Sequence, residues 1–197
     1  MNESGLLARL LEVLEVDVVP LTREGVRAGN KIFGAAIVSK RDGSLVVAGT
    51  NAEKQCPLWH GEIATIKKLY EMPAKARPAP KECIFLSTHE PCSMCLSAIT
   101  WAGYDTIYYL FAYEQTRDAF HIPHDLHILK EVFRCEDGDY AHDNVYWTSR
   151  GIPALVGACP EPERGELHKR VEDLGRVYGE LSALYQASKA DDDIPLS

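Results

Sequence analysis

Residues 83–102, CIFLSTHEPCSMCLSAITWA, join a short apolar run to a helical pattern and carry two thiols at the junction. The run 83–87 has the length and apolar content of a buried β-strand. Pro91 precedes Cys92 and Cys95, and a proline is common where a helix begins because the first N–H groups of a helix have no partner within it. The stretch therefore predicts a strand that leads into a helix with both thiols near its start.

A second junction of this kind lies upstream, where His60 and Glu62 precede the apolar spacing of another helix. The residues with this spacing are Ile63, Ile66, Leu69 and Tyr70. The positive end of a helix dipole lowers the pKa of a nearby thiol, so a helix start favours the thiolate form of Cys92 and Cys95. The thiolate is the form of cysteine that binds zinc.

One imidazole and two thiolates supply the three N and S ligands of a catalytic Zn²⁺, whose fourth position stays open for water. The sequence therefore predicts that His60, Cys92 and Cys95 bind zinc. Glu62 would take the proton of the water and pass protons to a ring nitrogen and to the departing ammonia. This combination predicts hydrolytic deamination.

Two other interpretations of these motifs stay open. A Cys-x-x-Cys pair alone is often redox-active or structural. A closed structural zinc site would need one more ligand, such as Cys56 or Cys83, and would make the chain a noncatalytic zinc-binding or interaction protein. The strand pattern around Cys83 favours a small buried hydrophobic side chain instead.

The order His-x-Glu followed by Pro-Cys-x-x-Cys is the signature of zinc deaminases, and residues 19–129 resemble the cytidine deaminase superfamily. The resemblance extends to Phe33-Gly34-Ala35, to Asn51 and to the run from Glu90 to Ala102. That run is most similar to the branch of guanine deaminases, fungal-type cytosine deaminases and tRNA adenosine deaminases.

The resemblance implies a cofactor, an assembly and a set of site residues. The cofactor is Zn²⁺ and the assembly is a homodimer. The implied residues are His60, Cys92 and Cys95 as zinc ligands, Glu62 as proton shuttle, Asn51 as a hydrogen-bond partner of the substrate ring, Phe33 as a wall of the pocket, and Gly61 as a backbone contact to the substrate.

His89 is a further candidate for substrate contact, because it stands just before Glu90-Pro91 and the first thiol. A supporting position behind the pocket or a solvent-exposed position fits the pattern equally well. The sequence leaves these three roles open.

Three histidines, His121, His124 and His127, recur at every third position. Pro123 interrupts a helix there and no further thiol or paired carboxylate joins them, so a loop flanking the active site is favoured over a second metal site. Such a loop could close as a lid, with Asp118, Phe120 or His124 reaching the substrate.

The apolar runs predict the order strand–strand–helix–strand–helix–strand. Runs 32–38 and 45–48 are joined by an Asp-Gly turn and predict an antiparallel hairpin, whereas the helical crossovers that follow predict parallel neighbours. The later strands are expected at 83–87, 106–110 and 154–156. The fold class is α/β, a three-layer α/β/α sandwich with a five-stranded mixed sheet, as in cytidine deaminase-like proteins.

The length of 197 residues suits a single deaminase domain over residues 1–197. Its expected extensions are a helix over about 4–16 capped by Ser4, a helix over about 164–187, and a disordered acidic tail over 190–197. Gly175 and Gly179 weaken the second of these helices, which suggests that they permit close packing.

The formal net charge is −8, and lysines and arginines are scattered along the chain. This balance favours a small substrate over a nucleic acid, because proteins that grip a phosphate backbone gather basic residues. No signal peptide or membrane span is expected, and six cysteines without a secretory signal are expected to be thiols of a cytoplasmic protein. The favoured substrate is a free nucleobase or a related aminated heterocycle. The resemblance implies a guanine-like purine first, with adenosine in tRNA as the alternative.

Overall fold

A five-stranded mixed sheet forms the centre of the computed structural model, which describes residues 2–189 and 194–196. Its strands are β1 (Gly34–Ser39), β2 (Leu45–Thr50), β3 (Cys83–His89), β4 (Thr106–Phe111) and β5 (Thr148–Gly151), in the spatial order β2-β1-β3-β4-β5. β1 is antiparallel to β2 and to β3, whereas β3, β4 and β5 are parallel. The predicted hairpin and the mixed sheet are therefore confirmed.

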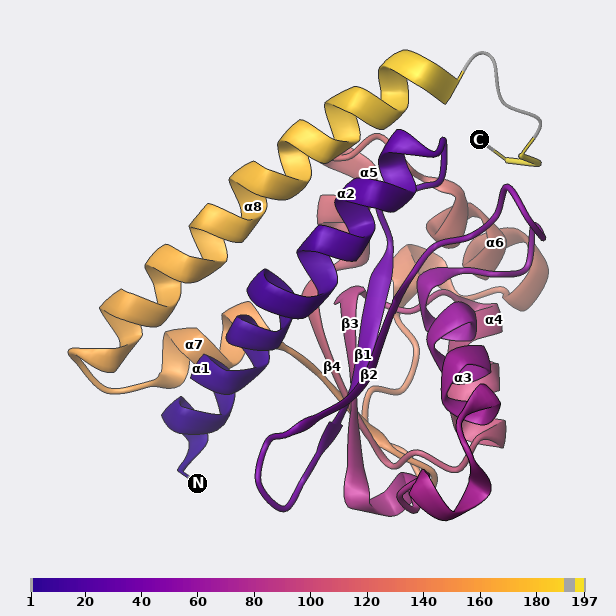
Figure 1. Cartoon of the computed structure of the whole chain (residues 1–197). Helices are drawn as coiled ribbons and strands as arrows, with labels where there is room; N and C mark the ends of the chain where they lie inside the picture. Colours follow the sequence, from indigo (N-terminus) through magenta and orange to yellow (C-terminus); the bar gives the residue numbers. More distant parts are fainter. Residues whose placement is uncertain (1, 190–193, 197) are drawn as a thin grey trace.

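Helices cover both faces of the sheet (Figure 1). The α-helices are α1 (Glu3–Val13), α2 (Val19–Arg27), α3 (Gly61–Glu71), α4 (Ser93–Trp101), α5 (Tyr113–Asp118), α6 (His124–Phe133), α7 (Ile152–Ala158) and α8 (Glu163–Ser188). Short 3₁₀ turns occur at Ala74–Ala76, Pro80–Glu82 and Glu136–Gly138. α3 and α4 lie on one face, and α1, α2 and α8 lie on the other (Figure 1). This arrangement confirms the three-layer sandwich.

Alternate residues of β1 belong to the two separate hydrophobic cores. Ala35 and Ile37 pack under α3 and α4, whereas Ala36 and Val38 pack under the N- and C-terminal helices. β3 is buried along its whole length. A strand that is buried on both faces reads as a continuous apolar run, which is why the sequence located it correctly.

The fifth strand is not where the sequence predicted it. Residues 154–156 belong to helix α7, which has Pro153 in its first turn and buries Ile152 and Val156 four residues apart. β5 instead consists of Thr148–Gly151, which lacks an apolar run and is recognised only by its pairing with β4.

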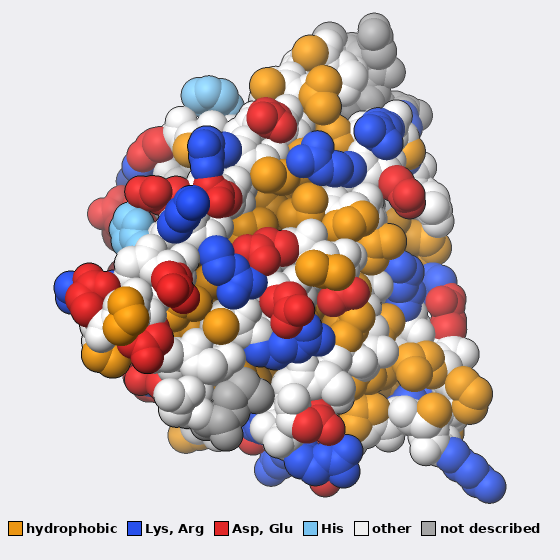
Figure 2. All heavy atoms as spheres, turned by 60° about the vertical axis from the view of Figure 1, so that its left-hand side comes forward, with side chains coloured by type: hydrophobic (Ala, Val, Ile, Leu, Met, Phe, Trp, Pro, Cys, Tyr) orange, Lys and Arg blue, Asp and Glu red, His pale blue; other side chains and the backbone are white. Residues whose placement is uncertain are grey.

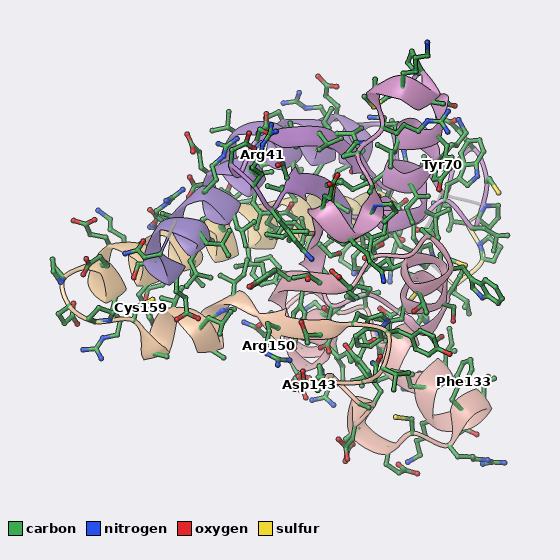
Figure 3. The ribbon with its side chains drawn as sticks, turned by 90° about the horizontal axis from the view of Figure 1, so that it is seen from below. Arg41, Tyr70, Phe133, Asp143, Arg150 and Cys159 are labelled. Atoms are coloured by element: carbon green, nitrogen blue, oxygen red, sulfur yellow. The ribbon has the colours of Figure 1, made fainter. Side chains whose placement is uncertain are left out.

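A loop folds back against β5. Arg150 of the strand pairs with Asp143 of the preceding loop, with 2.6 Å between guanidinium and carboxylate, and Figure 3 shows the two side chains together. Asp143 also forms an isolated bridge with Thr148. These contacts hold the loop on the edge of the sheet.

The N-terminal helix begins one residue before the prediction. Its N-cap is Asn2, whose side chain accepts a hydrogen bond from the Gly5 N–H at 3.0 Å, so Ser4 is not the cap. A π-helical segment, Leu14–Val18, joins α1 to α2. Together they form a continuous helical arm on the sheet (Figure 1).

The C-terminal helix α8 agrees with its predicted range, but its glycines do not serve close packing. A Cβ built on Gly175 or Gly179 would meet nothing within 4 Å. Residues 190–193 and 197 of the expected acidic tail lie outside the described residues, and Ile194 is buried. Within the described ranges, no helix has both the length and the apolar character to cross a membrane.

Charges of both signs are interspersed on the side where α1 and α8 lie (Figure 2). No continuous basic surface is visible on that face. The view agrees with the acidic balance of the sequence, which favours a small substrate.

Gly61 sets how closely α3 approaches the sheet. A Cβ at this position would lie 2.9 Å from the Cα and N of Gly34 and 2.9 Å from the carbonyl carbon of Phe33. These atoms are backbone and cannot move aside as a flexible side chain would. Gly61 therefore packs directly on β1.

Replacement of Gly61 by alanine should reduce the free energy of unfolding by about 1–3 kcal/mol, because the added methyl group overpacks a helix–strand contact. Urea titration followed by circular dichroism measures the change. Gly179→Ala is the matched control, since that glycine faces open space within a helix; it should stabilise by about 0.5–1 kcal/mol. Equal stability of Gly61→Ala and the wild type would show that the approach of α3 is not limiting.

Candidate active site

Three potential metal ligands come together where α3 and α4 begin. His60 is the N-cap residue of α3, Cys92 is the N-cap residue of α4, and Cys95 lies in the first turn of α4. Their ligand atoms lie within 4.8 Å of one another, with Cys92 Sγ 3.5 Å from His60 Nδ1. The structure thus assembles the three residues that the sequence predicted as ligands.

The donor set fits a catalytic zinc ion better than a closed one. Two sulfurs and one imidazole nitrogen are typical zinc donors. Neither Cys56 nor Cys83 belongs to the metal-binding group found among the described residues. Cys83 begins β3, whereas Cys92 follows its end. A fourth protein ligand from these cysteines is therefore not supported.

The same search gives no metal-binding group containing His121, His124 or His127 among the described residues. His124 and His127 lie on helix α6, for which Pro123 is the N-cap residue. Pro123 therefore precedes a helix here, whereas the expectation was that it interrupts any helix at these histidines; a short helix was expected only later in the segment, which ends at about residue 134.

Contacts between the three candidate ligands shift the pKa of each of them. A hydrogen bond from Cys95 and the neighbouring His60 hold the pKa of Cys92 well below its usual range against the opposing effect of burial. Burial and the negative charge of Cys92 and Glu62 raise the pKa of Cys95. Burial disfavours charge on His60, but its hydrogen bond to Cys92 and the nearby negative charges raise the pKa of His60 to about 9.

Glu62 lies beside the ligands without belonging to their group. Its Oε1 accepts a hydrogen bond from Ser87 Oγ at 2.6 Å, and its Oε2 accepts one from Cys95 Sγ at 3.3 Å. The side chain is buried, and burial together with the charge of Cys92 raises its pKa, opposed by the Ser87 hydrogen bond. A carboxyl group in this position is suited to take up a proton and release it.

Glu53 was not recognised from the sequence, yet it contacts the candidate ligand His60. Its Oε1 lies 3.6 Å from His60 Nε2 and 3.0 Å from Lys31 Nζ. A carboxylate on one imidazole nitrogen orients the ring and leaves the other nitrogen for the metal. Here Nδ1 is the nitrogen on the Cys92 side. Glu53 lies in a loop without periodicity, so only its contacts reveal this position.

Asn51 is buried, and both the N–H side and the oxygen of its side-chain amide form hydrogen bonds with Glu53. Its Nδ2 donates to Glu53 Oε2 at 2.6 Å, and its Oδ1 accepts from the Glu53 N–H at 3.1 Å. Asn51 is not among the residues that line the cavity beside the metal ligands, which is described next. Its predicted contact with a substrate stays a prediction.

A cavity of about 440 Å³ opens beside the ligands. Phe33, His60 and Cys92 line it, as predicted for the pocket, and Met94 and Ser97 of α4 extend the wall. Its other lining residues are Lys31, Glu53, Pro57, Leu58, Ser93, Ile122, His124, Asp125, Ile128, Phe133, Pro195 and Leu196. Of these, Phe133 comes from the end of α6 (Figure 3).

Asp125 brings a carboxyl group to this cavity from the first turn of α6. Burial and the charge of Cys92 raise its pKa to about 8, while His60 and Lys31 act in the opposite direction. The sequence placed this segment near the site and offered Asp118, Phe120 or His124 as the residue that reaches the substrate. Of these three, His124 lines the cavity. Asp118 ends α5, is exposed and pairs with Arg117, so it does not reach the cavity.

Helix α8 fixes the segment that carries Asp125. Ser182 Oγ and Gln186 Nε2 both donate to the carbonyl oxygen of Phe120, each at 3.0 Å. Pro123 then opens α6 two residues before Asp125. The C-terminal helix therefore contributes to the position of one cavity wall.

His89 lies behind the cavity and is fully buried. Its ring is surrounded by Phe33, Phe111, Phe120 and Tyr178, with centroid distances from 4.7 to 5.5 Å. Burial lowers its pKa to about 3, so the imidazole is neutral. His89 is not a lining residue, and its packing on Phe33 supports the position behind the pocket.

Glu90 supports the chain just before the first thiol. Its Oε1 accepts hydrogen bonds from Tyr140 Oη at 2.7 Å and lies 2.9 Å from His142 Nε2. Its Oε2 accepts from the Tyr113 N–H at 3.1 Å. This buried carboxylate links the residues just before Cys92 to the start of α5 and to the loop that contains Tyr140 and His142.

Residues 16–111 match the family described as the cytidine and deoxycytidylate deaminase zinc-binding region. The chain is 36% identical over 117 residues to the guanine deaminase of Bacillus subtilis, covering 58% of this chain and 71% of that protein. It is 25% identical over 87 residues to a probable cytosine deaminase of Schizosaccharomyces pombe, covering 44% of this chain and 51% of that protein.

One solved structure supports the fold. It is that of NE0047 in complex with 2,6-diaminopurine, with a TM-score of 0.51 and 21% sequence identity. The match covers 93% of this chain and 82% of that chain. At this identity the likeness concerns the arrangement of helices and strands.

Zinc binding should release protons and therefore strengthen as the pH rises. In the metal-free site His60 is protonated below about pH 9 and Cys95 keeps its proton, and both must lose it to bind zinc. Between pH 6 and pH 9 the apparent affinity should rise by about 10- to 100-fold per pH unit, for one or two protons released. Competition with a chromophoric chelator, corrected for the chelator's own protonation, measures this. An affinity independent of pH would contradict the assignment, and His60→Ala should bind more weakly with a shallower dependence.

Proposed function

Because the chain belongs to the family of zinc-dependent deaminases, it is a zinc-dependent nucleobase deaminase, and we propose that a guanine-like purine is its substrate. The observation that carries this conclusion is the buried Glu62 carboxyl beside a group of one imidazole and two thiol ligands. The relative from Bacillus subtilis supports guanine over other bases.

The reaction replaces an exocyclic amino group by a carbonyl oxygen and releases ammonia. When bound by His60, Cys92 and Cys95, zinc lowers the pKa of a water molecule towards neutrality and so provides the nucleophile. Glu62 accepts a proton from this water and transfers it to a ring nitrogen of the substrate. The water oxygen would bond to the ring carbon that carries the amino group, and Glu62 would move the second proton from that oxygen to the amino group. The C–N bond then breaks, ammonia leaves and the oxygen remains as the carbonyl.

The environment of Glu62 suits this double role. Ser87 holds Oε1, so Oε2 is left on the side of the ligands. Its raised pKa lets the carboxyl group hold a proton between the two transfers, and burial keeps that proton from bulk water.

The cavity offers different chemistry on its different walls. Asp125, when ionised, accepts hydrogen bonds only, and it suits the N–H groups of a 2-aminopurine ring. Phe33 offers an apolar ring as a wall. We keep Asn51 and the backbone of Gly61 as proposed substrate contacts, since the Asn51 amide retains one further N–H and one further lone pair.

Loss of the Glu62 carboxylate should abolish turnover without loss of the metal. We expect the zinc-loaded wild type to release ammonia from guanine and Glu62→Gln to be slower by about 10²–10⁴-fold. Coupled measurement of ammonia over free bases, nucleosides, nucleotides, triazines and tRNA tests both the reaction and the substrate class. Zinc content by metal analysis and the circular dichroism spectrum should match the wild type.

The outcomes separate the alternatives. Unchanged ammonia release by Glu62→Gln would remove Glu62 from the role of proton shuttle. Release from tRNA but from no free base or nucleoside would replace the small-substrate proposal. An absence of release from every compound, with zinc fully bound, would favour a noncatalytic zinc protein.

We also propose a homodimer in a reducing compartment, the cytoplasm. Trp101 and Val145 are 91% and 92% exposed. A hydrogen bond from Trp147 Nε1 to Thr100 Oγ1 holds the loop that carries Val145 near the end of α4, where Trp101 lies. Exposed large apolar side chains mark contact surfaces, and the six cysteines are free thiols. Light scattering should give twice the mass of the chain, and Trp101→Glu should reduce it; a monomeric wild type would contradict the dimer.

A further inference from the structure

A lysine is buried in the wall of the active-site cavity. Lys31 is 5% exposed and lines this cavity together with His60 and Asp125. Buried lysines are rare and are normally paired, because an ammonium group loses its hydration when it leaves water. A lysine in this position therefore needs a specific partner.

Glu53 satisfies only part of this requirement. Among the described residues, the acceptor within hydrogen-bonding distance of Lys31 Nζ is Glu53 Oε1, at 3.0 Å. An ammonium group has three N–H donors and no acceptor. Two of its donors therefore have no hydrogen-bond acceptor among the described residues, and the residue that carries them lines the cavity.

The Lys31 ammonium is held in a fixed relation to the metal ligands. The oxygen that it contacts, Glu53 Oε1, is also the one 3.6 Å from His60 Nε2. The other oxygen of Glu53 accepts the Asn51 amide at 2.6 Å. Glu53 is therefore held by Lys31, His60 and Asn51, and one of its oxygens lies between the Lys31 ammonium and the His60 imidazole.

The cavity thus carries a donor-only group and an acceptor group. Lys31 provides N–H donors, and Asp125 provides a carboxyl group, which has an oxygen that accepts a hydrogen bond in either protonation state. Guanine presents two acceptors, O6 and N7, on one edge, and lysine is among the side chains that commonly pair with that edge in nucleic-acid recognition. A 2-aminopurine without O6 lacks one acceptor, and a 6-amino group would present donors towards the ammonium.

We propose that Lys31 is the specificity-determining residue of this active site and selects 6-oxopurines by donating to their O6 and N7 edge. This inference rests on the proposed deamination of a guanine-like purine. It goes beyond that function because it assigns the recognition of the 6-oxo group to one side chain. Glu53 is the positioning residue that holds the ammonium against the cavity.

Lys31→Met tests the proposal through selectivity and not through activity alone. The wild type should have a higher kcat/KM for guanine than for 2-aminopurine, which has the same reacting amino group but no O6. Lys31→Met should lower kcat/KM for guanine by about 10- to 100-fold, the range expected for a bidentate contact, and change 2-aminopurine by less than about threefold.

A binding measurement makes the test independent of turnover. Competitive inhibition by hypoxanthine, which has the 6-oxo group, should weaken about 10- to 100-fold in Lys31→Met. Unsubstituted purine keeps N7 but lacks O6, so its inhibition should weaken much less than that of hypoxanthine. Zinc content of each variant is measured so that a loss of metal is not mistaken for a loss of recognition.

Two controls separate recognition from structure. Lys31→Met with Glu53→Gln removes the unpaired buried carboxylate that the single change leaves, and it should keep the same loss of selectivity. Lys40→Met removes a partly exposed lysine that pairs with Asp105 away from the cavity, and it should leave selectivity unchanged.

The result that overturns the inference is an equal loss for guanine and 2-aminopurine, with equal weakening of hypoxanthine and purine. That result would make Lys31 a counter-ion of Glu53 and would leave the proposed deaminase function intact. If the zinc-loaded wild type released ammonia from no purine and bound neither hypoxanthine nor purine, the proposed function itself would fail, and the inference with it.

Discussion

The close contact between Gly61 and the backbone of β1 is the constraint on which the active site depends. It brings the start of α3 onto the sheet, so His60 and Glu62 lie at the level where β3 ends and α4 begins. The chain leaving β3 then needs only a short turn to place Cys92 and Cys95 beside them. A Cβ at position 61 would lie 2.9 Å from the backbone of Phe33 and Gly34, so the start of α3 or this part of the sheet would have to shift.

Burial and a concentration of negative charge around these helix starts shift the pKa values of Glu62, Asp125 and His60. Burial is the largest effect on Glu62 and on Asp125, and the charge of Cys92 adds to it in both. The same anionic surroundings raise the pKa of His60 although burial opposes its charge. A bound divalent cation relieves this repulsion, so the metal-free site holds protons in the place of the metal. The electrostatics thus agree with the chemistry of the donor set.

Two layers of the fold supply the cavity walls. The metal side comes from the starts of α3 and α4, which cover one face of the sheet, whereas Lys31 and Phe33 lie just before β1. The opposite wall, with Asp125, is carried by α6 and held in place through the carbonyl of Phe120 by α8. Elements from the whole length of the chain therefore meet at one cavity, which explains why substrate recognition is harder to predict than metal binding.

The sequence by itself determined the candidate zinc ligands, the neighbouring Glu62, the hairpin and the three-layer fold. These features depend on local spacing: residues three or four apart share one face of a helix, and buried strands read as apolar runs. Only the tertiary structure decided the position of β5, the exposure of Asp118, the burial of His89 and the presence of Lys31, Glu53 and Asp125 at the cavity. Those features depend on pairings between residues far apart in the chain, which leave no periodic pattern in it.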